Sequence, residues 1–425
     1  MQKRQPHLEH LNQTQVSVVI PTYNHAHFVG AAIQSVLNQT YREFEIIVVD
    51  DGSTDDTRSI VAQFRDQVRY IWQENQGLSA ARNSGIRAAN GEFIALLDAD
   101  DMYEPAFLSK LISQLEANPD GDAVYCGYQF VDATNNPLPH IEKRVVPPDQ
   151  LYDVLLNGNF MAPECMLVRK RCYTEGQLFD EALRACEDWD MWLWISKQYK
   201  VLGTSDVLTR HRILSGSMSS DPVRMLNNRL AVLQKHFGIT KSDLFRLTPA
   251  QRQAYGLIYL TTAVEYLQRH ELDQASLCLR KMLELSPNLL TRLDIFYELG
   301  CGDQPKGFRG DFSTLNVHQN ASVLIEMLKK LFGDPGLPPG LRGYRRVAFA
   351  NAYLALGLLF YGTRQFGAAR RFLLRALATN PRHTFNRQLV VPLAKSLLGA
   401  RLINQVGRGR RTLHSLGSVL QRERL

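Results

Sequence analysis

Apolar and polar positions alternate in blocks along the first 126 residues. Short apolar runs, typical of buried parallel strands, are separated by stretches whose apolar residues recur on one helical face. The runs predict strands at 16–20, 44–50, 68–73 and 93–97. The stretches between them predict helices around 28–37, 60–64 and 78–89, with a further helix opening at Pro105. This alternation predicts an α/β fold, with a mostly parallel sheet covered by helices on both faces.

The pattern becomes less regular between residues 126 and 237. Residues 132–149 are rich in proline and predict an irregular loop. A further strand is expected at 158–168 and a helix at 187–199, which carries Trp189, Trp192 and Trp194.

After about Phe237 the pattern predicts helices only. Six positions recur 94 residues further along: Tyr259, Ala263, Tyr266, Ala275, Leu279 and Pro287 correspond to Tyr353, Gly357, Phe360, Ala369, Leu373 and Pro381. Small residues at helix crossings and a closing proline make this pattern similar to the tetratricopeptide repeat. Residues 333–343, rich in Gly and Pro, predict a connecting loop.

Composition limits the class of protein. The chain has 425 residues, of which 45% are hydrophobic and 21% charged, as expected for a globular protein of two or three domains. None of the six cysteines forms a Cys-x-x-Cys pair, so neither a zinc site nor a disulfide framework is indicated, and reduced thiols in a cytoplasm are expected. Residues 1–15 are polar, unlike a signal peptide, and no apolar run reaches the roughly 18 residues that span a bilayer.

The net charge of +7 is concentrated at the C-terminus. From Arg382 onward there are nine Lys or Arg residues and one acid, Glu423. One interpretation is an amphipathic basic helix in peripheral contact with the cytoplasmic face of an anionic membrane. The alternative is a helix that caps the repeats, followed by a solvated basic end. No nucleic-acid partner is expected.

Carboxylates follow two of the predicted strands directly. Asp50 and Asp51 end one apolar run, and Asp98, Asp100 and Asp101 end another. The carboxyl ends of parallel strands meet at one rim of the sheet, where ligands bind. Clustered acidic oxygens suit Mg²⁺ or Mn²⁺, often together with substrate phosphates. These residues predict a metal-assisted enzyme that acts on a phosphate-containing substrate, although Asp101 is also placed to cap the helix near Pro105.

Five motifs in order make residues 15–237 resemble inverting glycosyltransferase family 2, with its nucleotide-diphospho-sugar transferase fold. They are VVIPTYN at 18–24, DDGSTD at 50–55, NQGLSAARN at 75–83, DADD at 98–101 and EDWD at 187–190. The implied domains are a polar extension (1–15), a catalytic domain (16–237), a helical tetratricopeptide-like domain (238–400) and a basic tail (401–425).

The resemblance implies donor-site roles. It assigns the nucleotide base and ribose to Pro21, Tyr23 and Asp51, and uracil is favoured because Asp51 can accept a hydrogen bond from an imide N–H. Asp98 would contact the ribose or the metal shell, Asp100 would bind Mn²⁺ or Mg²⁺, and Arg82 would contact the diphosphate or the base.

The resemblance also implies an acceptor site. Asp188 matches the general base, with Asp190 as its rival, and Trp189 and Trp192 either line the acceptor site or belong to the core. The family's Tyr-Arg-x-His motif falls on His211 to Leu214, so its histidine is replaced by Leu214, and His211 is the candidate substitute.

The implied activity is transfer of one sugar, with inversion, from a nucleotide diphospho-sugar, in particular a UDP-sugar, to a glycan or lipid-linked acceptor in cell-surface glycan synthesis. The Gln-x-x-Arg-Trp motif of the processive synthases is absent, which favours single addition. The alternative is a catalytically weak, transferase-like scaffold that binds protein partners through its helical repeats.

Overall fold

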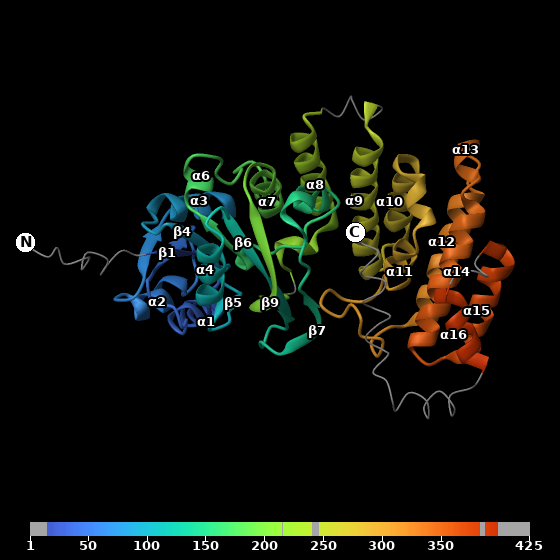
Figure 1. Cartoon of the computed structure of the whole chain (residues 1–425), viewed down its shortest axis with the longest axis horizontal. Coiled ribbons are helices and arrows are strands. Elements are labelled where there is room, and N and C mark those ends of the chain that lie inside the picture. Colours follow the sequence, from blue (N-terminus) through green and yellow to red (C-terminus); the bar gives the residue numbers. More distant parts are fainter. Residues whose placement is uncertain (1–14, 215, 240–245, 383–386, 398–425) are drawn as a thin grey trace, which may run out of the picture. The chain divides into compact units, whose positions relative to one another are not determined.

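The computed structural model describes residues 15–214, 216–239, 246–382 and 387–397 (Figure 1). The chain divides between His236 and Phe237 into two compact units, called here the N-terminal unit and the helical unit. Among the described residues, no helix combines the length and apolar character needed to cross a bilayer.

The first half of the sheet in the N-terminal unit is parallel, as predicted. Its strands are β1 (Val16–Thr22), β2 (Phe44–Asp50), β3 (Arg69–Trp72) and β4 (Phe93–Leu96), in the order β3-β2-β1-β4. Because β1 is paired on both sides, its apolar run is entirely buried, and Thr22 lies opposite Asp50 at the carboxyl end.

The second half makes the sheet mixed. Next to β4 come β8 (Met166–Arg169), β6 (Ala123–Val131), β9 (Val201–Arg212) and β5 (Met102–Tyr103), with β7 (Pro137–Glu142) paired to β6. The pairs β4–β8, β6–β8, β6–β7 and β5–β9 are antiparallel, whereas β6–β9 is parallel.

Two local predictions need correction here. The strand expected at 158–168 is the short β8, because the 3₁₀ turn η3 (Pro163–Cys165) precedes it. The proline-rich stretch at 132–149 contains β7 and the turn η2 (Pro148–Gln150) instead of being wholly irregular. Prolines are accepted in β7 because it pairs on one side only, with β6.

Helices cover both faces of the sheet. The helices and remaining 3₁₀ turns of this unit are α1 (Ala26–Leu37), α2 (Thr57–Val61) with the 3₁₀ turn η1 (Ala62–Phe64), α3 (Leu78–Ala88), α4 (Phe107–Ala117), α5 (Leu151–Leu156), α6 (Arg171–Thr174), α7 (Glu187–Gln198), the turn η4 (Met218–Ser220) and α8 (Pro222–Phe237). Val18 of β1 shares a core with α1 and α4. Val19 faces α3, where a Cβ on Gly85 would come within 2.2 Å of it.

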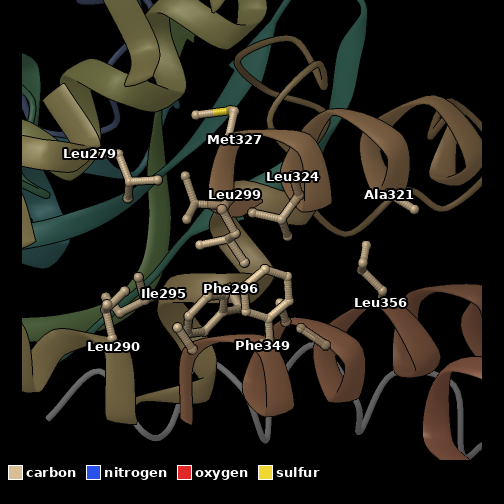
Figure 2. Packing of buried hydrophobic residues seen from close by; sticks show 14 of the residues in the cluster. Leu279, Leu290, Ile295, Phe296, Leu299, Ala321, Leu324, Met327, Phe349 and Leu356 are labelled. Carbon is tan, nitrogen blue, oxygen red and sulfur yellow. The ribbon is translucent and has the colours of Figure 1, made fainter. Parts of the chain in front are cut away.

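The helical unit consists of paired helices. They are α9 (Pro249–Gln268), α10 (Leu272–Leu285), the turn η6 (Pro287–Thr291), α11 (Leu293–Gly300), α12 (Val317–Gly333), α13 (Pro339–Arg342), α14 (Arg345–Gly362), α15 (Phe366–Thr379) and α16 (Arg387–Leu397). Figure 2 shows their common core, in which Leu279, Phe296, Leu324 and Phe349 from four different helices converge.

The 94-residue repeat appears as two hairpins with the same turn. His270 between α9 and α10 has φ 60°, and Arg364 between α14 and α15 has φ 62°. The next amide donates to equivalent carbonyls, from Glu271 to Tyr266 at 2.9 Å and from Gln365 to Phe360 at 2.8 Å. The small residue predicted at the second crossing is needed, because a Cβ on Gly357 would lie 2.6 Å from Leu373.

The structure describes only part of the C-terminal region for which an amphipathic basic helix is predicted. On α16, Leu389 is buried in the helical core while Val390 and Val391 are exposed. Residues 398–425, with the whole predicted basic tail (401–425), lie outside the described residues, as do residues 1–14 of the polar extension.

Candidate functional site

The loops that follow β1 and β2 are fastened to each other. Asn24, in a left-handed conformation with φ 55°, donates its N–H to Ser53 Oγ at 2.9 Å and accepts from the Thr54 N–H at 2.8 Å. Pro21 is buried within β1, whereas the next aromatic, Tyr23, is 46% exposed. The structure therefore presents the Tyr23 ring to solvent from a braced loop.

Asp50 and Asp51 are buried and largely occupied by protein donors. Asp50 accepts from the Ser53 N–H at 2.8 Å and the Tyr70 hydroxyl at 2.6 Å. Asp51 accepts from the Gln73 side chain and from the N–H groups of Gln76 and Gly77, at 2.7 to 3.0 Å. A carboxylate offers about four acceptor positions, so Asp51 has little capacity left for a ligand.

Arg82 lies at the centre of a buried ion cluster. It is fully buried, and its Nη1 donates to Glu187 at 2.6 Å while its Nη2 donates to both Asp98 oxygens at 2.7 and 2.9 Å. Burial lowers the pKa of the guanidinium, but the charges of Asp98 and Glu187 outweigh this and raise it. The cluster joins the loop after β4 to the start of α7, and the diphosphate or base contact expected of Arg82 stays a prediction.

The loop at 98–101 leaves one carboxylate available. Among the described residues, the Asp100 side chain has no hydrogen-bond partner, whereas its backbone carbonyl accepts from Arg212 Nε at 2.7 Å. Burial, followed by the charges of Asp101 and Asp98, raises the pKa of Asp100 to about 6. A carboxylate held at its backbone but unpaired at its oxygens is suited to bind a cation.

Asp101 does not cap the next helix, contrary to one expectation. The residue before α4 is Ala106, and that helix start has no side-chain cap. Asp101 instead accepts from the Arg212 N–H at 2.7 Å and lies 3.3 Å from His211 Nδ1. Asp101 therefore fastens the loop at 98–101 to β9.

His211 contacts two buried acids. Its Nδ1 lies 3.0 Å from Glu164 Oε1, in addition to its contact with Asp101. Burial lowers the pKa of His211, yet the two carboxylates outweigh burial and raise it well above its usual value. Ligand atoms of Asp101, Glu164 and His211 lie within 4.8 Å of one another, a separation that can accommodate a metal ion.

Glu164 is not among the site residues predicted from the sequence. Its signal was an acid within the otherwise apolar stretch before β8, where burial demands a partner.

Asp188 lies in the first turn of α7, and Asp190 two residues later is engaged elsewhere. Asp188 is half-buried and accepts from the Asn159 amide at 2.8 Å. Burial, with the charge of Glu187, raises the pKa of Asp188 to about 7. Asp190 is fully buried against Lys235 at 2.7 Å and His236 at 3.0 Å, so the rival base holds α8 to α7.

The tryptophans of α7 belong to the core. Trp189 and Trp192 are nearly fully buried, and their indole N–H groups donate to the carbonyls of Leu155 and Met161. This geometry supports the core interpretation over the acceptor-site interpretation.

Comparison with known proteins identifies the family. Residues 17–175 match the sequence model for glycosyl transferase family 2. An uncharacterized glycosyltransferase of Rickettsia typhi is 34% identical over 242 residues, which are 55% of this chain and 72% of the relative. The chain belongs to glycosyltransferase family 2. The matched region contains Asp51, Arg82, Asp98 and Asp100 and ends before Asp188.

The alignments with two further relatives, whose names refer to glycan biosynthesis, cover most of each relative's length. The putative teichuronic acid biosynthesis glycosyltransferase TuaG of Bacillus subtilis is 32% identical over 48% of this chain and 82% of TuaG. The UDP-Glc:alpha-D-GlcNAc-diphosphoundecaprenol beta-1,3-glucosyltransferase WfgD of Escherichia coli is 30% identical over 51% of this chain and 85% of WfgD. Among solved structures, S. aureus TarS 1-349 in complex with UDP aligns with a TM-score of 0.41 and 20% identity, over 65% of this chain and 91% of that chain.

Proposed function

We propose that this member of glycosyltransferase family 2 transfers one sugar, with inversion, from a UDP-sugar to an acceptor hydroxyl, using Mg²⁺ or Mn²⁺ held by Asp100. The observation that carries the proposal is the Asp98–Arg82–Glu187 cluster. It joins the loop of the available Asp100 carboxylate to the helix turn of Asp188, so two acids of different roles are held by one rigid group of charges.

On the donor side, the free Asp100 carboxylate fits a divalent cation, and oxygen ligands are what Mg²⁺ and Mn²⁺ prefer. A bound cation would offset charge that develops on the departing diphosphate. Asp98 orients the same loop and reaches the ribose or the cation shell with its exposed edge. Tyr23 supplies an exposed ring for the base, and the buried Pro21 precedes it near the end of β1. Three protein donors use the Asp51 carboxylate, so about one acceptor position remains for a uracil N–H.

On the acceptor side, Asp188 is the general base. A base is most effective when its pKa lies near the operating pH, and that of Asp188 is about 7. The Asn159 amide orients the carboxylate. In a single displacement, the acceptor oxygen attacks opposite the leaving diphosphate, so one base suffices and the anomeric configuration inverts. Arg82 acts as a positioning residue because its guanidinium is buried and paired.

The relatives support a class of donor and acceptor. WfgD, by its name, uses UDP-glucose and a diphosphoundecaprenol-linked sugar, and TuaG is named as a putative teichuronic acid biosynthesis glycosyltransferase. From this similarity we infer a UDP-sugar as the donor and a lipid-linked or growing cell-surface glycan as the acceptor.

Replacement of Asp188 by Asn tests the base. We expect loss of transfer with retained UDP-sugar binding, because the base acts on the acceptor. Asp153→Asn, at an exposed carboxylate on α5, is the matched control and should behave as the unmodified protein. Loss of donor affinity with turnover retained would move Asp188 to the donor site.

Replacement of Asp100 by Asn tests the cation. We expect loss of metal-dependent transfer and weaker donor binding, and full activity with Mg²⁺ or Mn²⁺ would contradict the assignment. A thermal-shift screen of uridine, guanosine and thymidine diphospho-sugars, with each cation, then tests the preference for uridine.

The basic C-terminal segment is proposed to contact the membrane that carries such an acceptor. The proposal rests on the charge pattern of the sequence. Liposome flotation of the full chain and of a chain truncated before Arg401 tests it. Binding that needs anionic lipid, weakens with salt and is lost on truncation is expected, whereas equal recovery of both chains in the unbound fraction would contradict it.

A further inference from the structure

Three side chains from separate segments of the N-terminal unit meet beside the loop at 98–101. Asp101 follows β4, Glu164 lies in the η3 turn before β8, and His211 is near the end of β9. The imidazole Nδ1 is 3.0 Å from Glu164 Oε1 and 3.3 Å from Asp101 Oδ2. The proposed catalytic roles of Asp100 and Asp188 make no use of this group.

The charges and hydrogen bonds of the group do not balance. Both carboxylates are buried. When both are ionised, a protonated imidazole compensates only one of their two negative charges. Glu164 Oε2 is buried and has no hydrogen-bond partner among the described residues. Asp101 Oδ1 is used by the Arg212 N–H, which leaves Oδ2 directed to His211. An uncompensated buried charge and an unpaired buried oxygen are both unfavourable.

The spacing of the three groups is that of metal ligands. Bonds of about 2.1 Å to nitrogen and oxygen place neighbouring ligand atoms about 3.0 Å apart in octahedral geometry and about 3.4 Å apart in tetrahedral geometry. The two contacts of His211 Nδ1 fall within this range, and all three residues offer a ligand atom within 4.8 Å of the others. A divalent ion would neutralise both carboxylates.

We propose that Asp101, Glu164 and His211 form a binding site for a divalent transition-metal ion, Zn²⁺ or Mn²⁺, distinct from the donor cation at Asp100. One imidazole with two carboxylates favours these ions over Ca²⁺. Because Asp101 and Glu164 are buried, a nucleotide phosphate does not complete this shell. The ion is structural, and it ties the 98–101 loop to β8 and β9.

The test uses the full chain with Asp100→Asn, which removes the proposed donor-cation ligand. Metal-stripped protein is titrated with Co²⁺ as a spectroscopic probe and then with Zn²⁺, and bound ions are counted after gel filtration. We expect one Co²⁺ per chain, displaced by Zn²⁺. Adding the isosteric Glu164→Gln should weaken Co²⁺ binding at least tenfold. Glu104→Gln, at a carboxylate that pairs with Arg210 of the same β9, is the matched control and should leave binding unchanged.

Zero bound ions in the Asp100→Asn chain would overturn the proposal by itself and leave the group as a hydrogen-bonded ion cluster only. Unchanged Co²⁺ affinity after Glu164→Gln would overturn it as well. If the Glu164 variant does not fold, the same Co²⁺ titration is made with His211→Gln in the Asp100→Asn chain, where weaker binding is again expected. Failure of the unmodified chain to bind any UDP-sugar would contradict the proposed function and leave this ion count unaffected.

Discussion

The two units bury different kinds of side chain. Charged groups are buried throughout the N-terminal unit: Asp50, Asp51, Arg82, Asp101, Asp122, Glu164, Glu187, Asp190 and Arg212. Among the described residues of the helical unit, Asp294 is the one buried charge, and it pairs with Arg292 at 2.6 Å. The remaining core of that unit is largely hydrocarbon.

Buried polar groups of the helical unit serve the backbone. Asn320 and Asn351 donate to the carbonyls of Gly300 and Leu290, each at 3.0 Å. In the N-terminal unit, several buried charges pair with charged side chains of other elements, as Arg82 does with Asp98 and Glu187. The difference shows that one unit uses its interior to place charges, whereas the other uses it to pack helices.

The positions of the tryptophans allow the unfolding of the two units to be followed separately. All four, Trp72, Trp189, Trp192 and Trp194, belong to the N-terminal unit. Tryptophan emission therefore reports the unfolding of that unit, while far-ultraviolet circular dichroism also reports the helical unit.

The largest effect is expected when the charge cluster is broken. Arg82→Met leaves the carboxylates of Asp98 and Glu187 without their cation, and should destabilise the N-terminal unit by about 3–5 kcal/mol. Guanidinium unfolding followed by tryptophan emission measures it. Arg87→Met on the same helix, where both partners are exposed, should cost less than about 1 kcal/mol. Equal effects of the two variants would show that the cluster does not hold the unit together.

A smaller effect is expected from overpacking the helical unit. An added methyl group in Gly357→Ala would lie 2.6 and 2.7 Å from Leu373 carbons, and should cost about 1–3 kcal/mol. Helical circular dichroism should then fall at lower denaturant than tryptophan emission does. If both signals shift together, the two units unfold as one cooperative unit, which contradicts the idea that their cores are independent.

The pH dependence of transfer tests the charged interior of the N-terminal unit. A pKa of about 7 for Asp188 makes the base ionised above that pH, so the rate should be roughly tenfold lower at pH 6 than at pH 8, or about 1.4 kcal/mol in barrier. Since this pKa is raised from 3.8 in the folded state, the contribution of Asp188 to stability is fully present below about pH 4 and is lost as pH rises from there to about 7. Initial rates at saturating donor give the profile. A flat profile from pH 6 to 8 would contradict the assignment.

The smallest effect is a stabilisation of the helical unit. Gly367 is the second residue of α15 and has open space around it, so Gly367→Ala should add about 0.4–1 kcal/mol by restricting the unfolded chain. Gly310→Ala also meets open space, but φ there is +93°, and it should destabilise. Thermal unfolding by circular dichroism compares the two variants, and equal shifts would show that backbone conformation does not decide the sign.

The regular half of the fold was predictable from the pattern of residues. The predicted strand at 44–50 coincides with β2, and the predicted helix at 78–89 exceeds α3 by one residue. β6 and β9 were not predicted. In β9 the residues Asp206, Arg210 and His211 interrupt the apolar pattern, because this strand carries ionic partners for other segments.

The sequence alone determined the parallel strands, the carboxylates at their ends and the paired helices, since these follow from the local periodicity of apolar residues. Only the tertiary structure decided which carboxylates remain available. Asp51 is occupied by the loop at 73–77, and Asp190 by Lys235 and His236, whereas the side chain of Asp100 has no partner among the described residues. The partners lie more than twenty residues away along the chain, so no local pattern encodes them, and their contacts are set by how the elements pack.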